Sequence, residues 1–411
     1  MAEGLLHRRG SEVDPAAPDL PPAGPANVAS THYDLAINGR FLSQPTTGVQ
    51  RVARELVREI DHLVHAGEFP LRLRLFCQKG APVDSLGLRA TSICEVEGPG
   101  GHFWEQVSLP RAIDATRLLC LGNTAPLSLL LHQRPVVLMI HDLSYRIYPE
   151  AYRPTYRLLH GLMMPTLLTR AETVFTVSKP ERHMLEALVP ACRGQVRVAQ
   201  NGGWRDAEGA TGAEPHAQGE DERFALYVGS LSRRKNIEGV LALAVRLWRE
   251  DRVRTVVVGS TGATISPTAF VIPDDVREGI SFLGQVEDVE RLAELYRTAA
   301  CLIFPSFYEA SPLPPIEAMH FGCPVVVSDI PAHRERCGDA AEYCNPADVA
   351  NMLAAVRRVL NDPAHAADLR ERGYARQRQF SWRTQARTIL QTIVHNAQAT
   401  APTAQVSNPP D

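Results

Sequence analysis

The sequence predicts an α/β protein made of two doubly wound domains of similar size. Short β-rich apolar runs alternate with helix-like stretches in both halves of the chain, a pattern typical of parallel sheets with crossover helices. The 411 residues are 45% hydrophobic and 22% charged, which is enough material for two separate cores. A stretch rich in glycine and charged residues, 206–222, separates the halves and predicts a linker.

The expected elements follow in order. Residues 1–30 are rich in proline, alanine and acids and predict a disordered tail, as do residues 399–411. The first domain spans 31–205, the second 223–378, and a final helix at 379–398 follows them. The predicted strands are 33–37, 73–76, 136–140 and 173–177 in the first half, and 225–228, 255–258, 281–283, 301–304 and 325–327 in the second.

Composition excludes several classes of protein. The formal charge of −3 provides no positive field for a polyanion, so we expect no nucleic-acid partner. Eight cysteines without a C-x-x-C pair predict reduced core thiols. No run approaches the roughly 20 apolar residues of a membrane helix. We therefore expect a cytoplasmic protein, with peripheral contact to the inner face of the membrane left open.

Two carboxylates flank one loop in the second half. The segment 304–329 reads FPSFYEASPLPPIEAMHFGCPVVVSD, in which a strand ends, a proline-containing loop follows, and a helix starts near Pro315. Glu309 and Glu317 stand at an E-x7-E spacing before and within that helix. Such carboxylates can bind vicinal hydroxyls, as in dinucleotide folds. The alternative is that Glu317 complements the helix dipole and Glu309 is a solvated loop charge.

Two adjacent cations follow the first strand of the second half. The segment 227–236 reads YVGSLSRRKN and opens a helix near Asn236. Arg234 and Lys235, just before a helix N-terminus, would suit a diphosphate. The alternative is a solvated basic turn.

Taken together, these motifs resemble the nucleotide-sugar half of the retaining, family-four type of GT-B glycosyltransferases (glycosyltransferase group 1, bacterial mannosyltransferase-like). The order Y-V-G-S-x4-K-N, F-L-G-Q-V and P-S-x-x-E-x7-E-A-M-x-x-G-x-P-V-V-x-S-D extends over about 110 residues. The resemblance implies two Rossmann-like domains facing across a cleft, the second binding the donor. It also implies that Arg234 and Lys235 hold the leaving diphosphate, Glu317 the donor ribose and Glu309 the transferred sugar.

One position departs from the family pattern. The family reads E-G-F-G-L-P after the first glutamate, whereas this chain has Glu309 followed by A-S-P-L-P, with Pro312 in place of a glycine. Proline cannot donate a backbone hydrogen bond. The donor contact made by this loop in the family is therefore in doubt here.

The first half supplies three further candidates. Gly48 precedes a predicted helix at 52–63 and could cradle phosphate, with Arg51 beside it; a plain glycine turn is the alternative. His141 ends the strand 136–140 and could donate to a sugar hydroxyl or phosphate through its ring nitrogens, although a lone histidine is more often structural. The resemblance favours the functional interpretation of both. Trp104 and Glu105 could line the acceptor side or, for Trp104, simply pack in the core.

The sequence therefore predicts a retaining hexosyltransferase that needs no metal and no cofactor. The expected donor is a nucleotide sugar, with GDP-mannose as the first choice and a UDP-hexose as the second. The expected acceptor is a glycan or a lipid-diphosphate-linked oligosaccharide of a surface polysaccharide. The proposed catalytic residues are Glu309, His141, Lys235 and Arg234, and the donor-binding residues are Gly48, Arg234, Lys235, Glu309 and Glu317. The alternatives are a non-catalytic nucleotide-sugar or glycan-binding protein and a glycoside hydrolase using Glu309 and Glu317.

Overall fold

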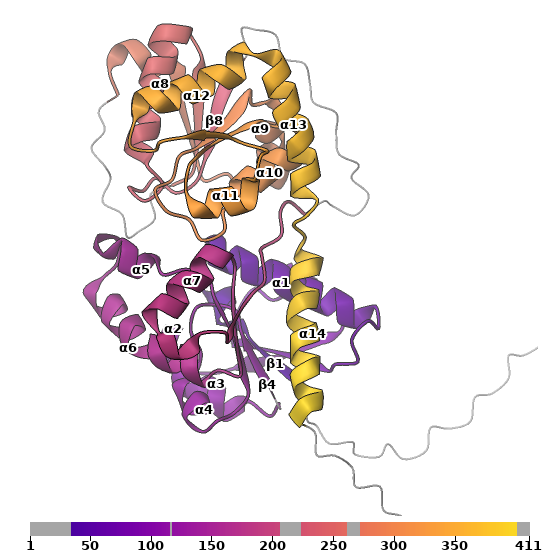
Figure 1. Ribbon diagram of the computed structural model, residues 1–411. Helices are drawn as coiled ribbons and strands as arrows, with labels where there is room; N and C mark the ends of the chain where they lie inside the picture. The colour runs from indigo at the N-terminus through magenta and orange to yellow at the C-terminus, as the bar shows by residue number, and fades with distance from the viewer. Residues whose placement is uncertain (1–33, 116, 206–222, 261–271, 401–411) are drawn as a thin grey trace, which may run out of the picture. The chain divides into compact units, whose positions relative to one another are not determined.

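Two parallel sheets organise the chain. The computed structural model describes residues 34–115, 117–205, 223–260 and 272–400, and both sheets belong to one compact unit (Figure 1). The predicted linker 206–222 and tail 1–30 lie outside the described residues, as does 401–411 of the predicted C-terminal tail. The predicted fold class, two doubly wound α/β domains, is confirmed.

In the described residues the first sheet has the order β3-β2-β1-β4-β5-β6-β7, with all neighbouring strands parallel. This order reverses direction beside β1, which places the β1 and β4 loops at the ligand-binding edge of such a sheet. The strands are β1 Leu35–Asn38, β2 Leu73–Gln78, β3 Thr91–Val96, β4 Arg117–Cys120, β5 Val136–Ile140, β6 Thr173–Thr176 and β7 Val196–Val198. The helices are α1 Gly48–His65, α2 Gly101–Phe103, α3 Leu109–Ala112, α4 Leu127–Leu131, α5 Ser144–Ile147, α6 Pro154–Arg170 and α7 Lys179–Leu188.

The second sheet, in the order β10-β9-β8-β11-β12-β13, is also parallel throughout its described strands. Its central strands β8 and β11 are neighbours, so their following loops emerge at one edge. The strands are β8 Phe224–Val228, β9 Arg254–Val258, β10 Ile280–Gly284, β11 Cys301–Phe304, β12 Val325–Ser328 and β13 Glu342–Cys344. The helices are α8 Ile237–Asp251, α9 Val289–Thr298, α10 Pro314–His320, α11 Pro331–Cys337, α12 Val349–Asn361 and α13 Pro363–Gln377.

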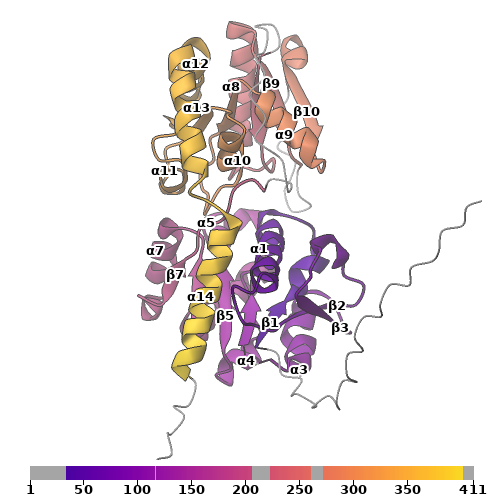
Figure 2. The same ribbon diagram turned by 90° about the vertical axis from the view of Figure 1, so that its right-hand side faces the viewer.

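The last helix, α14 (Trp382–Thr400), packs against α1, and Figures 1 and 2 show the two helices side by side. Trp382, Ile389 and Ile393 join Leu56 and Ile60 of α1 in one buried cluster. The Trp382 indole N–H donates to the Gly203 carbonyl at 2.9 Å. Helix α14 is thereby packed into the core of the first domain.

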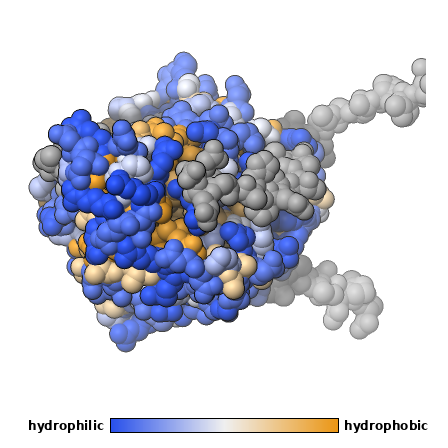
Figure 3. All heavy atoms as spheres, turned by 90° about the horizontal axis from the view of Figure 1, so that it is seen from above, coloured by the Kyte–Doolittle hydropathy of each residue, from blue (hydrophilic) through white to orange (hydrophobic). Residues whose placement is uncertain are grey.

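Apolar clusters line the sheets of both halves, and the strands β1, β5, β11 and β12 are buried along their whole length. The face drawn in Figure 3 is mostly hydrophilic, and hydrophobic residues are visible near its centre. Seven of the eight cysteines are buried, Cys94 is half-buried, and all eight are free thiols. No described helix is both long and apolar enough to cross a membrane.

Candidate active site

Two loops meet where β8 and β11 end. The first runs from β8 to α8 and carries Arg234 and Lys235, and the second runs from β11 to α10 and carries Glu309. The Phe307 N–H of the second loop donates to the Arg234 carbonyl of the first at 2.9 Å. Because adjacent parallel strands end at the same edge, charges from distant parts of the sequence come into contact here.

The β8–α8 loop is closed by Asn236. This residue has a φ of 58°, a left-handed conformation that asparagine tolerates. Its side chain caps α8 by accepting from the Gly239 N–H, and it donates to the Pro346 carbonyl at 2.6 Å. The turn directs the Lys235 ammonium over the Phe304 ring, 4.6 Å from the ring centroid.

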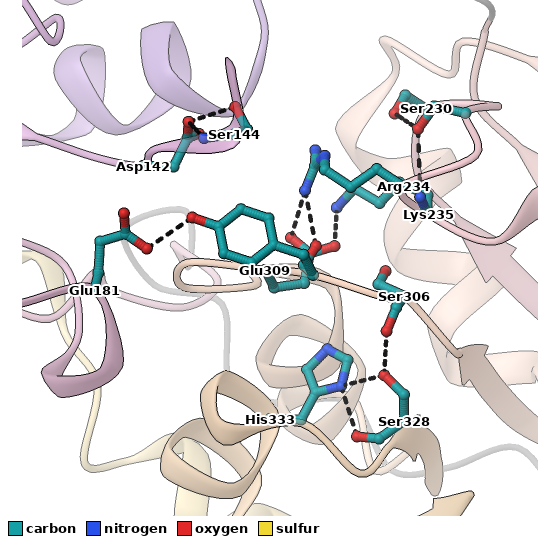
Figure 4. Close-up of polar contacts among 12 residues, drawn as sticks. Asp142, Ser144, Glu181, Ser230, Arg234, Lys235, Ser306, Glu309, Ser328 and His333 are labelled. Carbon is teal, nitrogen blue, oxygen red and sulfur yellow. Dashed lines mark hydrogen bonds and ion pairs between the residues drawn. The ribbon is translucent and has the colours of Figure 1, made fainter. Parts of the chain in front are cut away.

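Three of the predicted residues form one buried ion cluster, seen in Figure 4. Lys235 Nζ lies 2.6 Å from Glu309 Oε1, and Arg234 Nη1 lies 3.4 Å from Glu309 Oε2. Arg234 Nη1 also donates to the Tyr308 carbonyl at 3.0 Å. One carboxylate therefore pairs with both of the cations that the resemblance assigns to a diphosphate, and the cluster keeps a net positive charge.

Opposing effects act on this cluster. Burial alone would raise the pKa of the Glu309 carboxyl, but the charges of Lys235 and Arg234 outweigh it and lower that pKa to about 2. Burial lowers the pKa of Lys235, against the attraction of Glu309. Glu309 is thus ionised near neutral pH and cannot serve as a proton donor.

Glu317 does not join this cluster. Arg51 Nη2 of α1 lies 2.6 Å from Glu317 Oε1, and the Tyr296 hydroxyl donates to Glu317 Oε2 at 3.0 Å. The attraction of Glu317 raises the pKa of Arg51 above its ordinary value, against the effect of burial. Arg51, expected beside phosphate, thus pairs with the carboxylate expected to hold ribose. Pro312, between the two glutamates, is buried.

His141 has fewer free nitrogens than the sequence suggested. Its Nε2 donates to the Leu121 carbonyl at 2.8 Å, and its backbone N–H donates to Asn123 Oδ1. Because a carbonyl only accepts, Nε2 carries the proton; burial lowers the pKa of the ring and favours its neutral form. Donation from both nitrogens to a ligand is therefore ruled out, and Nδ1 remains as an acceptor.

Gly48 is the first residue of α1, and a Cβ added there would meet nothing within 4 Å. The glycine is therefore not required by local packing. Trp104 is a core residue whose indole donates to the Val96 carbonyl, so it does not line an acceptor site. Glu105 is equally buried, accepting from Asn38 and Thr124 and lying 3.3 Å from Arg40.

Sequence reasoning missed a histidine beneath the ion cluster. His333, in α11, is fully buried and its Nδ1 donates to the Ser328 carbonyl at 2.9 Å. Its Nε2 has no hydrogen-bond partner among the described residues, and neither does the hydroxyl of buried Ser306. Figure 4 shows that nitrogen and that hydroxyl on the side facing Glu309. Only the fold shows that His333 lies close to Glu309, because Glu309 follows β11 and His333 follows β12.

A contact between the two halves was missed as well. The Tyr308 hydroxyl, one residue before Glu309, donates to Glu181 Oε2 at 2.7 Å and accepts from the Leu143 N–H at 3.4 Å. Burial raises the pKa of Glu181 to about 8. No pattern in the sequence indicated this contact. Tyr308 stands next to Glu309 in the second half, and Glu181 follows S-K-P in the first half.

Comparison with known proteins now identifies the second half. Residues 212–376, which include Arg234, Lys235, Glu309 and Glu317, match the family described as "Glycosyl transferases group 1". The match spans less than half of the chain. The resemblance read from the motif order is confirmed.

Relatives of this glycosyltransferase segment include mannosyltransferases. The chain is 38% identical over 162 residues to the O-antigen chain mannosyltransferase B of Escherichia coli, covering 39% of this chain and 42% of that protein. It is 26% identical over 226 residues to the O-antigen chain mannosyltransferase RfbU of Salmonella typhimurium, covering 55% and 61%. The matches thus span less than two thirds of either relative.

The similarity to solved structures covers more of the chain than the sequence matches do. The sucrose-phosphate synthase of Thermosynechococcus elongatus superposes with a TM-score of 0.68 at 20% identity, covering 90% of this chain and 100% of that one. The group 1 glycosyltransferase segment therefore forms the second domain of a GT-B fold. Among the described residues no cluster of three or more His, Cys, Asp or Glu side chains could hold a metal ion.

Proposed function

We propose that the protein is a retaining glycosyltransferase that moves a hexose from a nucleoside diphosphate sugar to a hydroxyl group of a glycan. One observation carries this proposal: Arg234 and Lys235 converge at the ends of β8 and β11, inside a group 1 glycosyltransferase segment. Two fixed cations beside a helix N-terminus suit a leaving diphosphate. Glu309 pairs with both cations, and a bound diphosphate would take over that role.

The proposed reaction needs no enzymic nucleophile. The acceptor oxygen bonds to the anomeric carbon as the bond from that carbon to the diphosphate oxygen breaks. The acceptor proton passes to the departing phosphate oxygen, on the same face of the sugar. Arg234 and Lys235 stabilise the charge on the leaving group. Glu309, freed from its cations, would hold a hydroxyl of the transferred sugar rather than supply a proton.

We assign His333 and Ser306 to the sugar end of this site. A buried polar atom without a partner is costly, on the order of 1–3 kcal/mol, unless a ligand or water satisfies it. With its proton on Nδ1, His333 presents Nε2 as an acceptor, which suits a sugar hydroxyl. His141 Nδ1 and Gly48 would contact the donor from the first half, and Glu317 would bind the ribose once Arg51 releases it.

Mannose is the proposed sugar, since the relatives include two O-antigen mannosyltransferases. GDP-mannose is accordingly the first donor to test, with a UDP-hexose second. For the acceptor we propose a lipid-diphosphate-linked oligosaccharide of a surface polysaccharide. In support, an apolar cavity of about 350 Å³ lies beside α5 and α7, with a cation on its wall. Its lining residues are Leu143, Arg146, Ile147, Met184, Ala187 and Leu188.

The two alternatives are less well supported. A glycoside hydrolase needs a carboxyl group with a raised pKa as its acid, whereas the pKa of Glu309 is about 2. Glu317 is engaged by Arg51. A protein that only binds nucleotide sugars would have no need of Lys235 for turnover.

A ligand panel followed by a transfer assay tests the proposal. GDP, UDP, GDP-mannose and UDP-glucose should be compared by thermal shift, because a ligand that binds only the folded form raises the melting temperature. The matching donor should then transfer its sugar to a soluble acceptor, with the anomeric configuration kept, as read by NMR. We expect activity to persist in EDTA. Binding without transfer, or release of sugar from a glycoside, would contradict the proposal.

A further inference from the structure

The helix α6 is apolar on both of its faces. Met163, Met164 and Leu167 are buried against the first sheet, whereas Leu158 and Leu162 point outward and are 66% and 70% exposed. A helix that is apolar all round is normally buried on all sides. Among the described residues nothing covers the outer face, so α6 lacks a partner there.

Two further leucines of these helices are exposed. Leu159 of α6 is 40% exposed, and Leu131 of α4, the short helix that packs against α6, is 60% exposed. We call Leu158, Leu159 and Leu162 of α6 the leucine face. Leu158 and Leu162, one turn apart, lie side by side on the helix surface. Exposed leucines grouped in this way mark an interaction surface rather than scattered apolar residues.

The segment that carries the leucine face is locally basic. Residues 150–172 contain three arginines and two glutamates, of which Glu172 is paired with Arg117 and only Glu150 is exposed. Arg153 and Arg157 are exposed at the start of α6, and Arg170 is exposed at its end. The net charge of the whole protein is nevertheless −3, so this segment is locally basic within an acidic chain.

An anionic lipid surface fits this combination. A helix lying in a membrane interface buries an apolar face and keeps basic residues at the headgroups. Each arginine near an anionic surface strengthens binding about fivefold, and arginine side chains can extend their charges past a buried apolar strip. A second copy of the chain would instead place like charges opposite each other around the leucine face.

We propose that the leucine face and its flanking arginines dock the protein on an anionic membrane. This inference rests on the proposed function in one respect: a lipid-linked acceptor lies at a membrane, and the apolar cavity beside α5 belongs to the same half of the protein as α6. The docking is reversible and peripheral. It uses one face of α6, which is not part of the catalytic cluster.

Vesicle co-sedimentation of the full chain tests the docking surface. The protein should bind vesicles of phosphatidylglycerol and phosphatidylcholine, bind pure phosphatidylcholine weakly, and dissociate as salt is raised. The double variant Leu158→Gln with Leu162→Gln should lose about tenfold or more in partition coefficient. Val289→Gln, at a 58% exposed position of α9, is the matched control and should bind like the wild type.

The arginines have their own test. Arg153→Gln and Arg157→Gln should each weaken binding to the anionic vesicles about fivefold and reduce the salt dependence, while Arg277→Gln, exposed in the second half, should not. Every variant should keep the wild-type melting temperature, because the altered side chains are exposed.

Two results would overturn the proposal. One is equal vesicle binding by the wild type and the double leucine variant. The other is a wild-type dimer that the double variant dissociates without any vesicle binding, which would make the leucine face a self-association surface. Transfer to a soluble acceptor separates this inference from the proposed function. If the wild type transfers sugar but does not bind vesicles, only the docking proposal is wrong. If the wild type binds vesicles but does not transfer sugar, only the proposed activity is wrong.

Discussion

Lys235 and Glu309 form a pair whose loss affects folding as well as catalysis. Both side chains are nearly buried, so removing one partner leaves the other charge incompletely compensated. A lysine that only bound the leaving diphosphate would matter for turnover and hardly at all for folding. The geometry indicates that both should suffer.

For Lys235→Met we therefore expect a loss of about 3 kcal/mol in the free energy of unfolding and a loss of about 100-fold or more in kcat. Adding Glu309→Gln should recover most of the stability, because the unpaired carboxylate is removed, but none of the activity. Urea unfolding and transfer kinetics measure the two effects. Full stability of the single variant would show that Arg234 alone compensates Glu309.

His333 allows a sharper test of the sugar end of the site. His333→Ala removes the free Nε2 acceptor, so affinity for the nucleotide sugar should fall about tenfold, the value of one buried hydrogen bond. Affinity for the nucleoside diphosphate should stay unchanged, since Arg234 and Lys235 remain in place. Calorimetric titration with both ligands measures the difference. An equal loss for both ligands would indicate a purely structural role.

At the scale of elements, the buried strands were the most readily predicted. The predicted strands 136–140 and 301–304 coincide with β5 and β11, because continuous apolar runs mark strands buried on both faces. The edge strands β3, β7 and β13 were not predicted. They are short or alternate polar with apolar residues, and their identity depends on pairing with a neighbour. The central strand β4 was not predicted either.

The start of α1 offers a test at this scale. Gly48→Ala fills open space at the first helical position, so stability should stay equal or rise by about 0.4–1 kcal/mol. If a donor phosphate uses that space, the donor KM should rise several-fold. Gly161→Ala in α6, where a Cβ also meets nothing, is the matched control and should change stability alone. An unchanged donor KM in Gly48→Ala would remove Gly48 from the site.

At the scale of the whole molecule, Tyr308 and Glu181 join the two halves beside the ion cluster. The folded protein keeps the Glu181 proton up to a pH of about 8 because burial raises that pKa. The unfolded chain releases the proton near pH 4.5. The contribution of Glu181 to the free energy of unfolding should therefore fall as pH rises from about 4.5 to about 8.

Glu181→Gln should remove this dependence, making the variant more stable than the wild type at pH 8 by on the order of a few kcal/mol. Tyr308→Phe removes a hydrogen bond that lowers the pKa of Glu181, so the decline in stability should extend to higher pH. Urea unfolding at a series of pH values measures both curves. Parallel curves for Glu181→Gln and the wild type would refute the protonated state.

The sequence by itself determined the two parallel sheets and the meeting of Arg234, Lys235 and Glu309. Strand periodicity is local, and the loops after neighbouring parallel strands must share one edge. Only the tertiary structure decided that Arg51 engages Glu317, that His141 has one nitrogen left, and that α6 keeps an uncovered apolar face. Those properties depend on which surfaces from distant segments pack together, and neither composition nor spacing along the chain carries that information.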